Sequence, residues 1–163
     1  MKKENYELKD VFWVDDAACS NAMELIMDAR SENEALARMA VSAFIMECNP
    51  TIEELEDVKT AISEAVTNSI VHGYPEGRKG KVFLRAYIKD NTLYTEVEDK
   101  GVGIPDISKA MQPLFTTRPQ DERSGMGFAF MEAFTDRMSV ESRPGEGTKV
   151  CMEKIFGKEI TDV

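Results

Sequence analysis

Two stretches of alternating apolar and polar residues, separated by only two residues, constrain the fold of this chain most strongly. Both stretches, 81–89 and 92–99, alternate with a period of two, which is typical of a strand with one buried face. The Asp90-Asn91 link between them is long enough only for an antiparallel hairpin. In the first stretch one face holds Val82, Leu84, Ala86 and Ile88 and the other holds Phe83, Arg85, Tyr87 and Lys89; in the second, Leu93, Thr95 and Val97 are predicted to face the core.

The remaining elements are predicted from periodicity and from capping signals. We expect an edge strand at 23–28 and a second hairpin formed by 137–142 and 148–155. Helices are expected at 31–48, from 51 to about 72, and at 125–134. The first two begin with capping boxes, Ser31 to Glu34 and Thr51 to Glu54. Apolar residues recur at helical spacing in the first helix at Leu36, Met39, Ala40, Ala43 and Phe44, and the predicted buried stripe of the second is Ile52, Leu55, Val58, Ile62, Ala65, Val66 and Ser69.

The order of these elements predicts an α+β fold. Helices can cover only one face of such a sheet, which gives a two-layer α/β sandwich with mostly antiparallel strands. We expect one domain at 23–157, an N-terminal extension of uncertain order at 1–22 and a short tail at 158–163. Residues 104–124 contain three prolines and no clear period, so we expect a long loop there that serves as a lid.

Charge and composition exclude several classes of function. The net charge is −10, and residues 1–60 hold 14 acidic and only 6 basic residues. Nucleic acid is therefore not expected as a direct partner, whereas the acidic half could meet a basic protein or only keep the chain soluble. We see no apolar run for a membrane span and no secretory signal. The three cysteines share no metal-binding spacing, which favours reduced thiols in the cytoplasm.

A polar stripe on the second helix is the first candidate site. Glu64, Asn68 and His72 are spaced i, i+4, i+8, so on an α-helix they would share one face. A carboxylate, an amide and an imidazole suit a pocket that needs a base and a metal ligand. A solvated polar face is the competing interpretation, because most charged stripes on helices are of that kind.

Two glycine-rich turns add further candidates. Asp99 ends a predicted strand, and Gly101 and Gly103 after it would let the backbone approach a ligand closely, although a plain turn has the same pattern. Gly125 and Gly127 open a helix, where free N–H groups form a natural seat for phosphates. Arg123, two residues before Gly125, could pair with a terminal phosphate, or it could simply lie on the surface.

Taken in order, these pieces resemble the four sequence boxes of the GHKL ATPase and kinase superfamily, which shares the Bergerat fold. The resemblance is carried by EAVTNSIVHGY at 64–74, DKGVGI at 99–104, QPLFTTRP at 112–119 and ERSGMGF at 122–128. Within the superfamily these motifs are most similar to those of the anti-sigma factor kinases of sporulation. The likeness runs from about residue 23 to residue 156, so residues 1–22 fall outside it.

The resemblance implies a role for each matching residue. Glu64 would be the general base for a serine hydroxyl, and Asn68 would hold Mg²⁺. Asp99 would read the adenine of ATP, in a pocket shaped by Gly101 and Gly103. The other nucleotide-binding positions that it implies are Thr116 and Thr117 in the lid, Arg123 at the γ-phosphate, Gly125 and Gly127 at the phosphates, and Thr148 near the base. His72 is interpreted as structural.

The activity implied is that of an ATP-dependent serine kinase. Its substrate would be an anti-anti-sigma protein, and it would also sequester a sporulation sigma factor. Members of this family are homodimers through the N-terminal strand and first helix, where Arg38 would contact partners. Three alternatives remain open: a module that binds ATP without transfer, an ATP hydrolase of the gyrase or chaperone kind, and the related anti-sigma factor of a general stress response.

Overall fold

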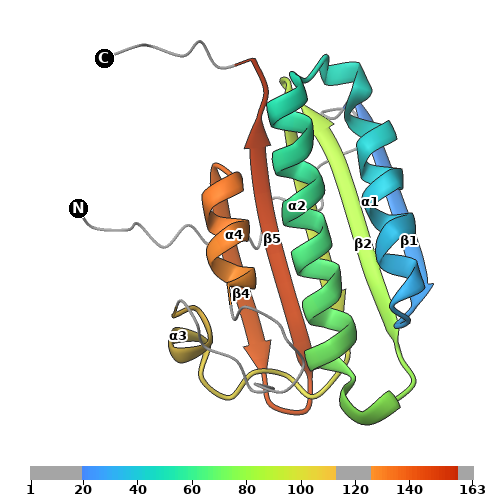
Figure 1. Cartoon of the computed structure of the whole chain (residues 1–163), viewed down its shortest axis with the longest axis vertical. Helices are drawn as coiled ribbons and strands as arrows, with labels where there is room; N and C mark the ends of the chain where they lie inside the picture. Colours follow the sequence, from blue (N-terminus) through green and yellow to red (C-terminus); the bar gives the residue numbers. More distant parts are fainter. Residues whose placement is uncertain (1–19, 113–125, 158–163) are drawn as a thin grey trace.

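A computed structural model describes residues 20–112 and 126–157 of the chain. Its five strands form one antiparallel sheet in the order β1-β2-β3-β5-β4 (Figure 1). The strands are β1 (Asn21–Asp28), β2 (Lys81–Lys89), β3 (Thr92–Asp99), β4 (Arg137–Arg143) and β5 (Gly147–Ile155). The predicted edge strand and both predicted hairpins are confirmed.

The helices that cover the sheet all lie on one of its faces, which confirms the predicted two-layer fold (Figure 1). They are α1 (Glu32–Phe44), α2 (Ile52–Asn68), α3 (Ile107–Ala110) and α4 (Gly127–Phe134), of which α1, α2 and α4 cover the sheet. Short helical turns extend two of them. The turn η2 (Ile45–Cys48) follows α1. The π-helical turn η3 (Ser69–Gly73) follows α2, and a separate turn, η4 (Pro75–Gly77), comes after it. In the described part of the chain, no helix is both long and apolar enough to cross a membrane.

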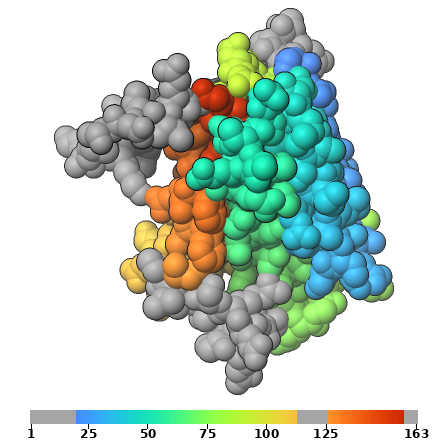
Figure 2. Space-filling model, turned by 45° about the horizontal axis from the view of Figure 1, so that its top comes forward, coloured from blue at the N-terminus to red at the C-terminus, as the bar shows by residue number. Residues whose placement is uncertain are grey.

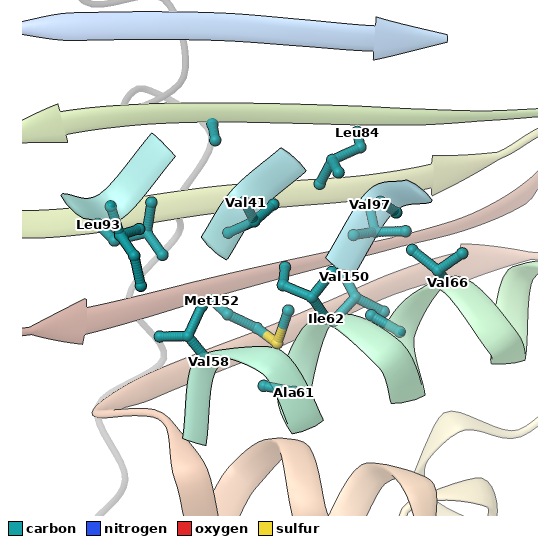
Figure 3. Close-up of a cluster of buried hydrophobic side chains, with 14 of the residues drawn as sticks. Val41, Val58, Ala61, Ile62, Val66, Leu84, Leu93, Val97, Val150 and Met152 are labelled. Atoms are coloured by element: carbon teal, nitrogen blue, oxygen red, sulfur yellow. The ribbon is translucent and has the colours of Figure 1, made fainter. Parts of the chain in front are cut away.

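The core fills the space between the helices and the facing side of the sheet (Figure 3). Its centre is made by Val41 of α1, Ile62 of α2 and Leu84 and Val97 of the sheet, each at most 1 % exposed. The alternation in β2 and β3 is therefore confirmed. The hairpin between them turns at Asp90 and Asn91, whose φ angles of 48° and 57° are the left-handed pair that a two-residue hairpin turn requires.

The two predicted capping boxes had different outcomes. At α2 the prediction is confirmed, because the Thr51 hydroxyl accepts from the Glu54 amide at 3.1 Å and the Glu54 carboxylate accepts from the Thr51 amide at 2.8 Å. At α1 it is wrong. Ser31 has helical backbone angles and makes no capping hydrogen bond, whereas a cap needs an extended backbone there. The Glu34 carboxylate is held by Arg38 and by the Ser63 hydroxyl instead.

The sequence also placed some apolar residues on the wrong side of a helix. In α1 and η2 the buried residues are Ala37, Val41, Ile45 and Cys48, whereas Leu36 is 50 % and Met39 is 63 % exposed. Ile52, predicted to be buried, is 83 % exposed because it lies at the first turn of α2, beyond the end of the core. The predicted long loop contains the short helix α3, and its residues 113–125 lie outside the described residues.

Candidate functional site

Three predicted site elements converge at one end of the domain, although they are far apart in the sequence. Asn68 is the last residue of α2, Asp99 is the last residue of β3, and Gly127 is the first residue of α4. The helix beginning at Gly127 lies directly against the polar stripe of α2. A Cβ atom at Gly127 would be 3.0 Å from Oε2 of Glu64 and 3.1 Å from Nδ2 of Asn68. Any larger residue at this position would crowd both polar groups.

Asp99 is a deeply buried carboxylate with several hydrogen-bond donors. It is 2 % exposed and accepts a hydrogen bond from the Gly101 amide at 2.9 Å. The Ser69 hydroxyl and the Thr148 amide also donate to it. Burial raises the pKa of the Asp99 carboxyl group above its ordinary value, and these hydrogen bonds only partly oppose the shift. Such a buried acid is typical of a functional site.

The π-helical turn after α2 approaches the end of β3 so closely that glycines are required. A Cβ atom at Gly73 would lie 2.7 Å from Cγ of Asp99. One at Gly101 would lie 1.9 Å from the carbonyl oxygen of Gly73, which accepts a hydrogen bond from Val102 at 2.9 Å. These two glycines therefore bring Asn68 and Asp99 into the same end of the domain.

The turn between β4 and β5 packs on the same loop. Gly103 has a φ of +73°, and a Cβ atom there would lie 2.0 Å from the Arg143 carbonyl oxygen. The Gly145 amide donates to the Val102 carbonyl oxygen at 2.7 Å. The predicted loop of Asp99 to Gly103 is thus fixed by backbone contacts on two sides.

Ser142 links Thr148 to this loop. Its hydroxyl accepts from the Ile104 amide at 2.7 Å, donates to the Gly147 carbonyl oxygen at 2.9 Å and lies 2.8 Å from the Thr148 hydroxyl. Thr148 is also paired with Asp99 across β3 and β5. Sequence reasoning assigned no site role to Ser142, which has no motif of its own.

Ser69 and Gly73 were also not predicted as site residues. The π-helical turn that places them begins directly after Asn68, and no sequence motif predicts it. Because α-helical geometry ends at Asn68, the predicted i, i+4, i+8 stacking holds for Glu64 and Asn68 but does not extend to His72, which is half-buried in η3.

The other predicted residues are Arg38, on α1, and four that lie in the stretch 113–125. Thr116, Thr117, Arg123 and Gly125 are outside the described residues. Arg38 lies on α1, where its guanidinium is 3.3 Å from the Glu34 carboxylate and its side chain is 38 % exposed.

A separate hollow lies beside the candidate site. It has a volume of about 990 Å³, lies between the turn from β1 to α1 and the segment η3–η4, and is lined by none of the predicted site residues. Within residues 20–112 and 126–157, no group of three histidine, cysteine or acidic side chains gathers to bind a metal ion.

Residues 27–154 match the family described as the histidine kinase-like ATPase domain. Two curated relatives named anti-sigma F factor come from Clostridium acetobutylicum and Caldanaerobacter subterraneus. The first is 55 % identical over 136 residues, which are 83 % of this chain and 94 % of the relative. The second is 53 % identical over 139 residues, which are 85 % of this chain and 96 % of the relative.

Solved structures agree on the fold. The RsbU and RsbW domains of a Mycobacterium tuberculosis protein match with a TM-score of 0.60 at 18 % identity, over 84 % of this chain and 32 % of that one. The catalytic domain of the histidine kinase ThkA matches with a TM-score of 0.52 at 16 % identity, over 83 % of this chain and 96 % of that one. The chain therefore belongs to the histidine kinase-like ATPase domain family, in the branch that holds the anti-sigma F factors.

Proposed function

We propose that this protein is an anti-sigma factor that binds a sporulation sigma factor and, as an Mg²⁺-ATP-dependent serine kinase, phosphorylates an anti-anti-sigma protein. The relatives at 53–55 % identity are named anti-sigma F factor, which supports the first part. The observation that carries the kinase part is the meeting of Glu64 and Asn68 with the first residue of α4, at the same end of the domain as Asp99.

Asp99 fits the role of reading the nucleotide base. A buried carboxylate can accept a hydrogen bond from an exocyclic amine, such as that of adenine, in addition to those from the protein. Gly73 and Gly101 let the backbone pack closely around Asp99, where a Cβ atom at either position would clash, so the carboxylate is held in a fixed place. Ser69 and Thr148, which donate to Asp99, would hold the carboxylate in one orientation.

Asn68 and the beginning of α4 fit the role of binding the phosphates and a metal ion. The free N–H groups at Gly127 attract negative charge, and the Asn68 amide offers the kind of oxygen ligand that Mg²⁺ prefers. Mg²⁺ is usually held by only one or two protein groups together with the phosphates, so a dense cluster of acids is not needed. When bound, Mg²⁺-ATP would supply the phosphoryl group that is transferred.

Glu64 fits the role of general base. It lies one turn before Asn68 on α2, half-buried, with its Oε2 oxygen close to Gly127. From this place the carboxylate could accept the proton of an incoming serine hydroxyl. Glu64 is the residue that distinguishes a kinase from a module that only binds ATP, because binding requires no base.

We also propose that β1 and α1 carry the partner surfaces, including that of a homodimer. These two elements lie side by side at the surface (Figure 2). Ile26, Leu36 and Met39 on them are 50–63 % exposed, although they are large and apolar. Exposed apolar groups of this kind are typical of protein interfaces. Arg38 lies on α1 together with Leu36 and Met39 and would provide a charged contact.

A mixing experiment tests the proposal. The protein is combined with a sporulation sigma factor and its anti-anti-sigma protein, with ATP or with ADP. We expect a complex with the sigma factor, and a phosphoserine on the anti-anti-sigma protein with ATP only, detected by mass spectrometry. Binding of a general-stress sigma factor alone would favour the related stress-response factor. If the protein binds nucleotide but no phosphoserine forms, the alternative of a module that binds ATP without phosphoryl transfer would be favoured.

A further inference from the structure

The sheet has a second face that α1, α2 and α4 do not cover (Figure 1). The residues of β2, β3 and β5 that alternate with the core residues point to this side. The strand register places Tyr87, Tyr94 and Glu153 in one row across it, and Arg85, Glu96 and Cys151 in the next. We call this surface the helix-free face.

The helix-free face is more buried than an open sheet surface would be. Tyr87 is 7 %, Glu96 4 % and Cys151 5 % exposed. Arg85 forms an ion pair with Glu96 on this face. Ile26, on the same side of the edge strand β1, is 52 % exposed, so the buried area is confined to the middle of the face.

The middle of this face also has an aromatic platform. The rings of Tyr87 and Tyr94 stack with their centroids 4.6 Å apart and their planes only 7° from parallel. A flat pair of rings on a sheet offers a large apolar area to a further aromatic or aliphatic segment.

The chain itself supplies such a segment at the right place. Ser20 is bound to the sheet through its amide and hydroxyl, which both donate to the Ile88 carbonyl oxygen, at 2.9 and 3.2 Å. This anchor is one residue from Tyr87 along β2. The preceding residues 1–19 contain the apolar run Val11–Val14 and three lysines. An extended segment of about ten residues reaches about 33 Å, which exceeds the roughly 20 Å width of five strands.

We propose that residues 1–19 dock on the helix-free face, with Val11–Val14 against the Tyr87–Tyr94 platform. The family match begins only at residue 27, so this contact would be a property of this chain rather than of the family. It is independent of the proposed kinase activity, because the helix-free face lies on the other side of the sheet from α2 and α4.

The chain contains a single tryptophan, Trp13, which makes the test direct. Trp13 fluorescence of the full chain is recorded in buffer and in urea, with acrylamide as quencher. Docking predicts a blue-shifted emission and at least a two-fold weaker quenching in buffer. A Tyr94→Ser variant should lose this protection. Ile52→Ser is the matched control, because Ile52 is exposed on the helical layer, and it should leave the protection unchanged.

Three results would overturn the proposal. The first is Trp13 emission and acrylamide quenching that are the same in buffer as in urea. This result can be interpreted without any variant. The second is protection that disappears on dilution, which would place the segment on a second copy of the chain. The third is protection that survives in a folded Tyr94→Ser variant, which would place Trp13 elsewhere on the molecule.

Discussion

Replacing Asp99 by asparagine separates nucleotide recognition from the stability of the fold. Asparagine has nearly the same shape, but it carries no charge and one of its acceptor oxygens becomes a donor. In the proposed site, the hydrogen bond from the exocyclic amine of the base would lose its charged acceptor. Asp99→Asn should therefore bind ADP and ATP more weakly.

The size of the effect follows from the burial of Asp99. A hydrogen bond to a charged group contributes about 1.5–3 kcal/mol, which corresponds to a roughly 10- to 150-fold loss of affinity. Stability should respond differently. Because burial raises the pKa of Asp99, the folded state disfavours the charged form, and removing the charge offsets part of the damage to its hydrogen bonds.

The assay is calorimetric titration with ADP, combined with thermal unfolding with and without ADP. At about 100 times the Kd, ADP should stabilise the wild type by about 2.7 kcal/mol, or roughly 5–10 °C in Tm. Asp99→Asn, with a 10- to 150-fold weaker affinity, should lose about half to nine-tenths of this shift at the same ADP concentration. Glu98→Gln is the matched control, since Glu98 lies on the same strand but points to the helix-free face, where it pairs with Arg85 and Lys100. Equal ADP affinity in Asp99→Asn and wild type would refute the assignment.

The pH dependence of the unliganded protein provides a second check. A carboxyl group with a raised folded-state pKa binds its proton more tightly in the folded state than in the unfolded state. Its contribution to stability therefore decreases as the pH rises from near the ordinary value of 3.8 through the folded-state pKa. Asp99→Asn should remove this component, so its stability should fall less over that range than that of the wild type. A parallel pH profile for the two proteins would contradict the raised pKa.

The remaining predictions concern the metal ligand, the loop and the interfaces. Asn68→Ala should abolish the gain in ADP affinity that Mg²⁺ gives the wild type, so titrations with Mg²⁺ and with EDTA should agree; a persisting gain would exclude Asn68 as ligand. Gly101→Ala should lower the unfolding free energy in urea by roughly 1–3 kcal/mol, because its Cβ atom would lie 1.9 Å from the Gly73 carbonyl oxygen; an unchanged midpoint would contradict this contact. Met39→Glu should weaken self-association in sedimentation experiments without altering ADP affinity, and no change would remove Met39 from the dimer surface. Raising salt should weaken the complex with the sigma factor if the acidic residues of 1–60 lie near it, whereas a salt-independent affinity would place them elsewhere.

The sheet was predictable because alternation reports directly on a face that is buried on one side only. Leu93, Thr95 and Val97 were assigned to the core correctly for this reason, and Val82, Leu84, Ala86 and Ile88 were correctly placed on one shared face. The helical faces were less predictable. α1 has apolar residues on two sides, and the sequence alone cannot say that Ala37 and Val41 face the sheet while Leu36 and Met39 face outward.

The site residues that stand in a sequence motif were predictable, whereas those that reach the site only through tertiary packing were not. Asn68, Asp99 and Gly127 stand in motifs, and the structure brings them to one end of the domain. Ser69 and Ser142 act through contacts that exist only after the chain has folded. The first depends on a π-helical turn, and the second on the turn between β4 and β5.

The most direct test of the central claim is phosphoryl transfer from labelled ATP to the anti-anti-sigma protein by the wild type and by Glu64→Gln. The account predicts that the variant binds ADP and the sigma factor as tightly as the wild type but transfers phosphate about 10²- to 10⁴-fold more slowly, because glutamine cannot accept the serine proton. Transfer at the wild-type rate by Glu64→Gln would contradict it.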